Sequence, residues 1–473
     1  MIKAIVIKVI FLLVFTYDIC GQKKYWIDND NPQIQKLIDS LQLNPQYCSD
    51  WAQACSYFLD KNQVDFFKNK IEILPVLKLK PLSTRLNKCI LSFALEQIEA
   101  QSFIDKNLNG NGVKIGIIDG GFLKADKDET LSHFFSSGNE KVHFYKDYVT
   151  PEMAPYGGSF GLDDGHGTEV WQLIGGYNPT KNIQYGLATE AIYYLARTDH
   201  GGYEKRLEED YIIQAMEEMA KMGVRLFNIS LGYTEDYTDK TENYLISDVD
   251  GKSSMLTRAL DKAASQHGLL FVISAGNDGA AAWQTLSIPA DAKNALTVGA
   301  SKFKIWDKIN YSSIGPETLD YVKPNISVYS TLGTSFTAPI VTGLAACMIQ
   351  YDSTLTNFEI MDILEKASNF YPFANNYVGY GVPTCSNIIK LLEGKENELI
   401  RPEEIHTTKN SVKIKVSNDV KTVVVFHKKD ERNVMHRINL KPHKNKVQIA
   451  KTSGSQQCSV LLETEVIEIF WED

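Results

Sequence analysis

One heptapeptide in the C-terminal half of the chain has the residue types of an activated nucleophile. Residues 333–339 read Gly-Thr-Ser-Phe-Thr-Ala-Pro, and apolar residues then recur at helical spacing to about residue 350. Ser335 therefore lies where a helix begins, and the free backbone N–H groups there favour a negative charge forming beside its hydroxyl. Gly333 permits a sharp turn before the serine, and Pro339 falls in the first helical turn, where its missing N–H costs little. This arrangement suits a hydroxyl that attacks a carbonyl carbon.

Two further residues are of the types that such a serine needs. Asp119 follows the apolar run 113–118, which is typical of a buried parallel strand, and open α/β sheets place their chemistry at the carboxyl ends of strands. His166 stands in Gly-His-Gly-Thr, at the start of a helix predicted to run to about residue 175. A histidine takes a proton from a serine hydroxyl and returns it to a leaving group when a carboxylate fixes its tautomer. Taken alone, each of these residues would be interpreted as a turn or helix-cap residue. The prediction of a catalytic site therefore depends on the presence of all three together.

The order along the chain is Asp119, His166, Ser335, which is the order of the subtilisin triad and differs from those of chymotrypsin and the α/β-hydrolases. On these motifs, residues 93–392 resemble the subtilase family. The resemblance implies a serine endopeptidase that acts on polypeptides through an acyl-enzyme and needs no cofactor. In it Asp119 orients the imidazole, His166 is general base and then acid, and Ser335 is the nucleophile.

Further segments resemble the family pattern. Residues 228–232 (Asn-Ile-Ser-Leu-Gly) are similar to the stretch that pairs with extended substrate as an added strand. Residues 274–279 (Ser-Ala-Gly-Asn-Asp-Gly) are similar to the oxyanion segment, in which Asn277 donates with the Ser335 N–H to the tetrahedral oxyanion. The substrate-binding residues that the resemblance implies are Ser230, Leu231, Gly232, Ala275 and Gly276. It also implies a cis peptide bond before Pro289.

Four features depart from the family pattern. They are Gly120 where Ser or Thr is common, Glu169 where a second His is common, Asn325 where Asp is common, and a short stretch from 325 to 333. The last two bear on the wall behind Ser335. None of them removes a group that moves protons or binds the oxyanion.

Strand and helix patterns alternate through the middle of the chain. The predicted helices are 93–105, 166–175, 208–222, 253–267, 335–350 and 357–367, and the predicted strands are 113–118, 191–196, 224–229, 269–274 and 295–300. Alternation of this kind requires a parallel sheet with helices on both faces. The predicted fold class is α/β and subtilisin-like, with a mostly parallel sheet in a catalytic domain 93–392, a small α+β prosegment and a small C-terminal β domain.

The start of the chain predicts export. Lys3 and Lys8 accompany an apolar run over 9–15, and a cleaved signal peptide 1–21 fits this pattern better than a membrane span. Residues 22–81 show a helix near 34–41, a strand at 57–59, a helix near 63–70 and a strand at 71–79. Residues 49–81 resemble subtilase prosegments, and we predict a prosegment 22–92 that is removed by a cut between 79 and 92. The predicted location is secreted, periplasmic or at the cell surface. Lipidation at Cys20 and an ordinary N-terminal packing domain remain alternatives.

The end of the chain predicts a separate module. Residues 393–404 are polar and charged, as in a linker, and residues 405–473 contain short alternating runs typical of a small antiparallel β domain. The predicted strands are 412–416, 422–426, 447–449, 460–462 and 466–470. A packing role is the simplest interpretation. Five lysines are predicted to form a solvated face: Lys428, Lys429, Lys441, Lys444 and Lys446.

Metal and thiol signals are weak. The stretch 247–251 (Ser-Asp-Val-Asp-Gly) has the start of a calcium loop but lacks the distal ligands, so a structural calcium ion is possible but unsupported. Six cysteines follow the signal peptide and allow fifteen disulfide pairings, with Cys347 expected as a buried free thiol. Asp163 and Asp164 either lie near the imidazole of His166 or face solvent as loop acids.

Composition and charge limit the function further. The net charge of −9 provides no basic surface for nucleic acid, and we expect a monomer whose partners are polypeptide substrates and its own prosegment. Two alternatives to the endopeptidase stay open. One is a catalytically silent subtilase-fold module used for binding or structure, and the other is an exopeptidase, such as a tripeptidyl peptidase, on the same fold.

Overall fold

The computed structural model describes residues 23–28, 38, 41, 43, 47–49, 54–59, 62, 63, 90–136, 140–158, 164–201 and 204–472. The chain divides into two units, 1–87 and 88–473. In the first unit, strands β1 (Lys23–Asp28), β3 (Ala54–Leu59) and β2 (Tyr47–Ser49) form an antiparallel sheet in that order, and β3 contains the strand predicted at 57–59. The predicted signal peptide, the strand 71–79 and most of both predicted N-terminal helices lie outside the described residues.

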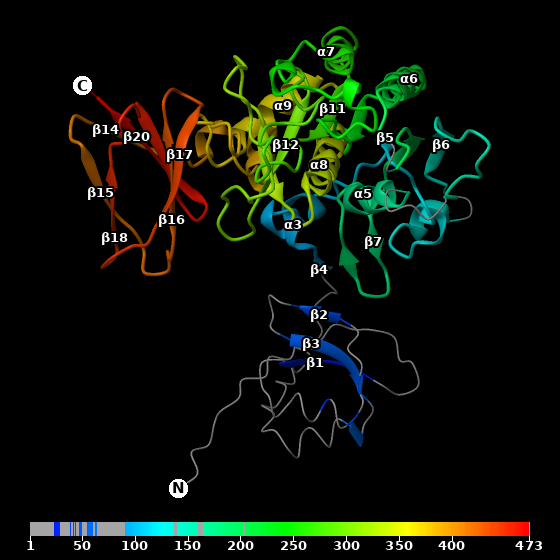
Figure 1. Cartoon of the computed structure of the whole chain (residues 1–473), viewed down its shortest axis with the longest axis horizontal. Helices are drawn as coiled ribbons and strands as arrows, with labels where there is room; N and C mark the ends of the chain where they lie inside the picture. The colour runs from blue at the N-terminus through cyan, green and yellow to red at the C-terminus, as the bar shows by residue number, and fades with distance from the viewer. Residues whose placement is uncertain are drawn as a thin grey trace. The chain divides into compact units, whose positions relative to one another are not determined.

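A seven-stranded sheet forms the centre of the second unit (Figure 1). All of its neighbouring strands pair in parallel, as the alternating pattern predicts. The strands, in spatial order, are β13 (Ile326–Tyr329), β12 (Leu296–Ser301), β11 (Leu270–Ser274), β10 (Leu226–Ile229), β5 (Lys114–Asp119), β9 (Ile192–Arg197) and β6 (Val142–Asp147). Every residue of β10, β11 and β12 is buried, which explains why these strands read as continuous apolar runs.

Helices cover both faces of this sheet. Successive strand residues point to opposite faces, so Leu226 belongs to one hydrophobic cluster and Phe227 to another. The first cluster contains residues of α5 (His166–Gly175), α8 (Ala338–Tyr351), α9 (Asn357–Lys366) and α10 (Cys385–Leu392). The second contains residues of α6 (Leu207–Lys221) and α7 (Met255–His267). The two-layered covering is the architecture that the sequence predicts.

Two predicted helices differ from the observed ones. The helix expected over 93–105 is broken into α3 (Phe93–Gln97) and α4 (Gln101–Ile104), because Glu99 adopts a φ of 55° that no α-helix contains. The helix expected from Ser335 begins instead with a 3₁₀ turn, η5 (Thr334–Phe336), before α8. Since that turn closes at Thr337, the serine lies just outside the α-helix rather than within it.

The C-terminal sheet has the order β14 (Glu403–Thr407), β20 (Glu465–Trp471), β19 (Gln457–Leu462), β16 (Val423–Lys428) and β17 (Val434–Leu440). It is antiparallel except for the parallel pair β14–β20. Strands β15 (Ser411–Lys415) and β18 (Lys446–Ala450) form a separate ribbon. Val424, Phe426 and Leu461 pack against Phe370 and Val378, so this sheet shares a hydrophobic cluster with the body of the second unit.

Lys428 does not belong to the solvated face predicted for it. Its side chain is fully buried, and its Nζ lies 2.8 Å from a carboxylate oxygen of the equally buried Glu468. Burial raises the pKa of Glu468, which the nearby ammonium opposes. Lys441, Lys444 and Lys446 are exposed, as expected.

Three cysteines of the described residues lie in the hydrophobic interior. Cys347, Cys385 and Cys458 are buried free thiols, which confirms the expectation for Cys347. Burial raises the pKa of Cys347, so it stays protonated, and its Sγ donates to the carbonyl of Leu108.

Among the described residues no helix combines the length and the apolar character needed to cross a membrane.

Candidate active site

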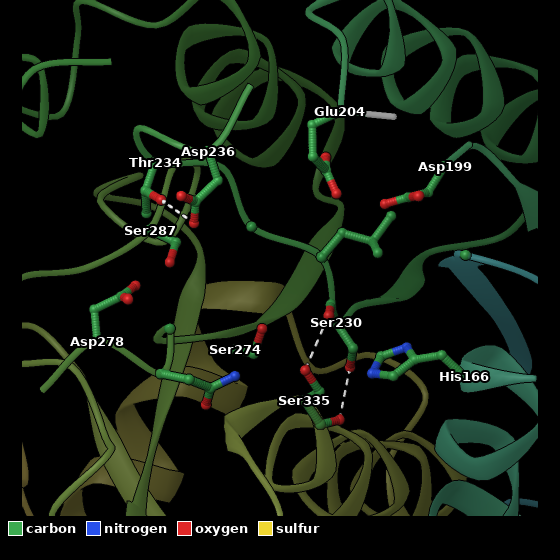
Figure 2. Close-up of a pocket in the computed structure, with 15 residues that line it drawn as sticks. His166, Asp199, Glu204, Ser230, Thr234, Asp236, Ser274, Asp278, Ser287 and Ser335 are labelled. Carbon is green, nitrogen blue, oxygen red and sulfur yellow. Dashed lines mark hydrogen bonds between the residues drawn. The ribbon is translucent and has the colours of Figure 1, made fainter. Parts of the chain in front are cut away.

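The predicted site residues come from four different elements at one edge of the central sheet. Asp119 is the last residue of β5, His166 the first of α5, and Ser335 lies in η5. Asn277 follows β11. His166, Asn277 and Ser335 line one cavity of 330 Å³ (Figure 2). Residues more than 200 positions apart therefore meet because parallel strands end at the same edge.

Asp119 and His166 are directly bonded. His166 Nδ1 lies 2.6 Å from Asp119 Oδ1, which also accepts the Gly120 N–H at 2.8 Å. A carboxylate that accepts at Nδ1 keeps the proton on this nitrogen, so Nε2 is the basic nitrogen of the neutral ring. Asp119 is fully buried, and its Oδ2 has no hydrogen-bond partner among the described residues. Gly120 has no side chain to supply a donor to that oxygen.

Ser335 is held by reciprocal bonds to the end of β10. Its Oγ donates to the carbonyl of Ser230 at 3.2 Å, and Ser230 Oγ donates to the carbonyl of Ser335 at 2.9 Å. Ser230 Oγ also accepts from Asn228 Nδ2 at 2.9 Å, and Asn228 Oδ1 accepts from Thr342 on α8. Figure 2 shows the imidazole of His166 facing both serines across the cavity. These bonds fix the position of the η5 turn relative to the sheet.

The side-chain amide of Asn277 has a defined orientation. Its Oδ1 accepts from the Thr334 N–H at 2.8 Å and from Thr334 Oγ1 at 3.0 Å. A backbone N–H can only donate, so the oxygen must face Thr334 and the Nδ2 amide is left toward the cavity. Thr334 Oγ1 in turn accepts the Gly276 N–H at 3.0 Å, which joins the two loops. Gly333, with a φ of 152°, makes the turn that this contact requires.

Arg197, which sequence reasoning missed, joins the elements that carry Asp119 and His166. It is only 6% exposed, and its Nε donates to the carbonyl of Gly120 at 2.9 Å. Its other nitrogens donate to Asp147, Thr150 and Asp164 at 2.8 to 3.1 Å. An arginine at the carboxyl end of a buried strand was the available signal, because a buried guanidinium requires carboxylate partners.

Of the two acids that precede His166 in the sequence, the structure describes Asp164 but not Asp163. Asp164 is 3% exposed and forms an ion pair of 3.0 Å with Arg197, so it does not face solvent. Asp163 lies outside the described residues. Asp164 belongs to the loop that precedes α5, and its ion pair with Arg197 holds this loop in place.

Four of the five predicted substrate-binding residues line the cavity: Ser230, Leu231, Gly232 and Gly276. Ala275 does not. Its side chain is fully buried, its N–H donates to Val298, and its carbonyl accepts from Ser287, so neither its backbone nor its methyl group faces the cleft. The peptide bond before Pro289 is cis, as the resemblance implies.

The hydrogen bonds of Asn325 explain why an amide fits at the position where an acid is common in the family. Its Oδ1 accepts from Lys323 Nζ and from the Thr297 N–H, both at 2.9 Å, while its Nδ2 donates to Glu365 at 2.8 Å. A carboxylate has no donor for Glu365, whereas an amide serves all three groups. Burial lowers the pKa of Lys323 to about 7.

The stretch considered as a calcium loop is a capped turn. Asp250 Oδ1 accepts the N–H groups of Lys252 and Ser253 at 2.9 and 2.7 Å, and Asp248 Oδ2 accepts the Leu245 N–H at 2.8 Å. These oxygens close the turn before α7, and a calcium ion is not needed to explain the residues.

The cavity wall carries several negative charges. Asp199, Glu204, Asp236 and Asp278 line it, and no Lys or Arg does so among the described residues. Burial raises the pKa of Asp278, and the charge of Asp236 adds to this effect. None of these acids could be identified as a site residue from the sequence, because their loops have no periodic pattern that indicates which residues face the cleft.

A parallel α/β sheet with this cleft at its carboxyl edge defines a protein of the subtilisin-like fold class. The family model described as the Subtilase family matches residues 110–381. Because this match covers more than half of the chain, the protein belongs to the subtilase family, a family of serine proteases.

Relatives and solved structures agree with this placement. Subtilisin NAT of Bacillus subtilis subsp. natto is 27% identical over 294 residues, which cover 59% of this chain and 66% of that protein. Subtilisin of Bacillus pumilus is 26% identical over 302 residues, which cover 61% of this chain and 95% of that protein. The Clostridium perfringens CspB protease structure matches with a TM-score of 0.50 and 15% identity, covering 63% of this chain and 99% of that chain. This last similarity shows the shared fold.

Proposed function

We propose that the protein is a secreted subtilisin-like serine endopeptidase that is made as a zymogen. The observation that carries the proposal is the 2.6 Å bond between Asp119 and His166 beside a cavity that His166 shares with Ser335 and the Asn277 amide. Base, nucleophile and oxyanion donor then face one space in which a substrate carbonyl can bind.

The residues have the following roles in this proposal. His166 Nε2 removes the proton of Ser335 as Oγ attacks the carbonyl carbon, after the hydroxyl leaves its bond to the Ser230 carbonyl. Asp119 holds the imidazole and stabilises its protonated form. The Asn277 amide and the Ser335 N–H stabilise the oxyanion, and His166 then protonates the leaving amine. Water resolves the acyl-enzyme by the same steps, so no metal or cofactor takes part.

The ends of the chain complete the proposal. We assign residues 1–21 to a cleaved signal peptide and residues 22–92 to a prosegment that covers the cleft until it is removed. The domain 93–392 would act as a monomer on polypeptides outside the cytoplasm or at the cell surface, and the module 405–473 would serve packing.

Hydrolysis of an internally quenched peptide that is blocked at both ends tests the endopeptidase activity. Wild-type protein should cleave it and the Ser335→Ala variant should not. Cleavage only of peptides with a free N-terminus would indicate the exopeptidase instead. No cleavage of any peptide by correctly processed protein would favour the catalytically silent module.

N-terminal sequencing of the exported protein tests the zymogen. We expect wild-type protein to begin between 79 and 93, and Ser335→Ala protein to begin near Gln22 because it cannot process itself. A shared start near Gln22 for both proteins would contradict self-processing.

A further inference from the structure

One loop of the second unit joins the C-terminal module to the oxyanion segment. Residues 302–313 follow β12 and turn back along it, since Ser301 and Lys308 form an antiparallel bridge. The first half of this segment, the 302–313 loop, contacts the module 405–473. Its second half contacts residues 276–279, which follow β11 and include Asn277. The loop therefore lies between the module and the proposed catalytic machinery.

Asp307 makes the main contact of the loop with the module. Its side chain is fully buried and pairs with Arg437 on β17 through two bonds, one from Nε to Oδ1 at 2.7 Å and one from a terminal nitrogen to Oδ2. Lys302 Nζ lies 2.6 Å from the same Oδ2. The Trp306 N–H also donates to the carbonyl of Glu463, at 2.8 Å. Because a two-bonded arginine fixes both distance and angle, β17 sets the position of the loop.

The second half of the loop holds the oxyanion segment. The Asp278 N–H donates to Ser313 Oγ at 3.1 Å, and the Gly279 N–H donates to the carbonyl of Tyr311 at 2.8 Å. In return, the Ser313 N–H donates to the carbonyl of Gly276 at 3.0 Å. These bonds lie on both sides of the residue that supplies the proposed oxyanion donor. The direction of its amide therefore depends on where the loop lies.

Close packing transmits a displacement along the loop. A Cβ atom on Gly279 would overlap the carbonyl oxygen of Ser312, so the two backbones are in direct contact. Lys308 Nζ donates to the same oxygen at 2.5 Å and to the carbonyl of Asn310 at 3.0 Å, which holds this part of the loop in shape. Lys308 directly follows Asp307. Since packed interiors transmit strain, a shift at Asp307 reaches the oxyanion segment.

We propose that Arg437 is a positioning residue for the oxyanion segment, on which it acts through Asp307 and the 302–313 loop. The module 405–473 thereby contributes to turnover in addition to packing. This inference rests on the proposed function, because it concerns the step in which Asn277 stabilises the oxyanion.

Turnover per active site separates positioning from packing. A fluorophosphonate counts the active sites, so kcat for a blocked, internally quenched peptide does not depend on the fraction of folded protein. An oxyanion donor acts in the transition state more than on bound substrate, so its displacement lowers kcat and leaves KM nearly unchanged. We expect Arg437→Met to lower kcat about tenfold, a part of the roughly 10²- to 10³-fold loss for removing one donor.

Two further substitutions of Arg437 grade the effect. Arg437→Lys keeps the charge beside Asp307 with a single ammonium group and should recover kcat to within about threefold of wild type. Arg437→Gln keeps a donor without the charge, and it replaces Arg437→Met in every comparison if the methionine variant does not fold.

Arg432→Met is the matched control. Arg432 belongs to the same module and donates to the carbonyls of Leu319 and Asp320, at 3.1 and 3.0 Å. Neither carbonyl belongs to the 302–313 loop, so this variant weakens the packing of the module without moving the oxyanion segment. It should leave kcat per active site unchanged. Equal losses of kcat in Arg432→Met and Arg437→Met would overturn the inference, because the module would then act by packing alone.

A double variant tests the route through the loop. Ser313→Ala removes the acceptor of the Asp278 N–H and should itself lower kcat. If Arg437 acts through this contact, the loss in the double variant with Arg437→Met should be smaller than the product of the two single losses. A loss equal to that product would contradict the proposed route.

Hydrogen exchange tests the inference without turnover. The N–H groups of Asp278 and Gly279 are the probes, because both donate to the loop. Mass spectrometry of peptides that span 276–280 should show exchange at least about tenfold faster in Arg437→Met than in wild type, and no change in Arg432→Met. Unchanged exchange in Arg437→Met overturns the inference whatever the turnover is. Absence of cleavage by wild-type protein counts against the proposed endopeptidase alone.

Discussion

Arg197 offers the sharpest test of how the fold positions the proposed catalytic pair. Replacing it with methionine keeps the length of the side chain and removes every donor. The Gly120 carbonyl then loses its bond from Nε, and Asp147 and Asp164 lose their ion pairs of 3.1 and 3.0 Å. We expect Arg197→Met to lower both stability and turnover.

The magnitude follows from burial. Asp147 and Asp164 are 5% and 3% exposed, so the substitution leaves two buried carboxylates without their cation. Breaking a buried ion pair from one side costs about 3–5 kcal/mol, equivalent to a change of roughly 150- to 5,000-fold in the unfolding equilibrium. Displacement of the strand end that carries Asp119 should lower kcat by about 10- to 100-fold, since small errors of alignment are expensive.

The assay combines urea unfolding, followed by tryptophan fluorescence, with peptide hydrolysis. Arg225→Met is the matched control, because Arg225 is exposed and, within the described residues, its guanidinium donates only to the backbone carbonyls of Ser353 and Leu355. It should change stability by less than about 0.5 kcal/mol. Arg197→Lys should fall between wild type and Arg197→Met, because one ammonium keeps the charge but cannot reach all four acceptors.

A double variant checks the reasoning. Asp164→Asn removes one of the two orphaned charges, so the pair Arg197→Met and Asp164→Asn should be less destabilised than the sum of the single changes. Strict additivity, or an Arg197→Met protein within 1 kcal/mol of wild type with full turnover, would refute the assignment of Arg197 as the residue that positions the pair.

Three further predictions concern separate parts of the molecule. Asn277→Ala should lower kcat by about 10²- to 10³-fold with little change in KM, the loss known for one oxyanion donor in a subtilisin, and an unchanged kcat would remove Asn277 from the mechanism. Because burial lowers the pKa of Lys323 to about 7, the unfolded chain binds more protons than the folded one from pH 7.5 to 9.5, so stability should rise with pH there. Thermal melting should show a smaller rise in Lys323→Met, and an identical rise would contradict the burial argument. In the C-terminal sheet, Lys428→Met should destabilise by about 3–5 kcal/mol because it orphans Glu468, while adding Glu468→Leu should recover much of that loss in urea unfolding.

The sequence predicted the sheet well because its strands are buried on both faces. The runs at 224–229 and 269–274 contain β10 and β11, and the alternation with helices predicted that the strands pair in parallel. The edge strand β6 was not predicted, since it is only partly buried and mixes His143 and Lys146 with apolar residues. The kink at Glu99 was missed because a single residue with positive φ leaves no periodic signal.

The candidate site also contains residues that could be predicted from the sequence and others that could not. Asp119, His166, Asn277 and Ser335 stand in short motifs whose glycines and flanking strands can be read directly, and the structure brings them to one cleft. Arg197 could not be assigned a position from sequence, because its partners lie 33 to 77 residues away. Lys428 was misplaced for a related reason: a lysine reads as solvated until the buried Glu468 opposite it is known.

Labelling with a fluorophosphonate tests the central claim most directly. This probe reacts only with a serine that a neighbouring base activates, and peptide mass spectrometry identifies the residue that carries it. We predict a single adduct on Ser335, absent in Ser335→Ala and strongly reduced in His166→Ala. Folded, processed protein that takes up no label, or takes it up on another serine, would contradict the account.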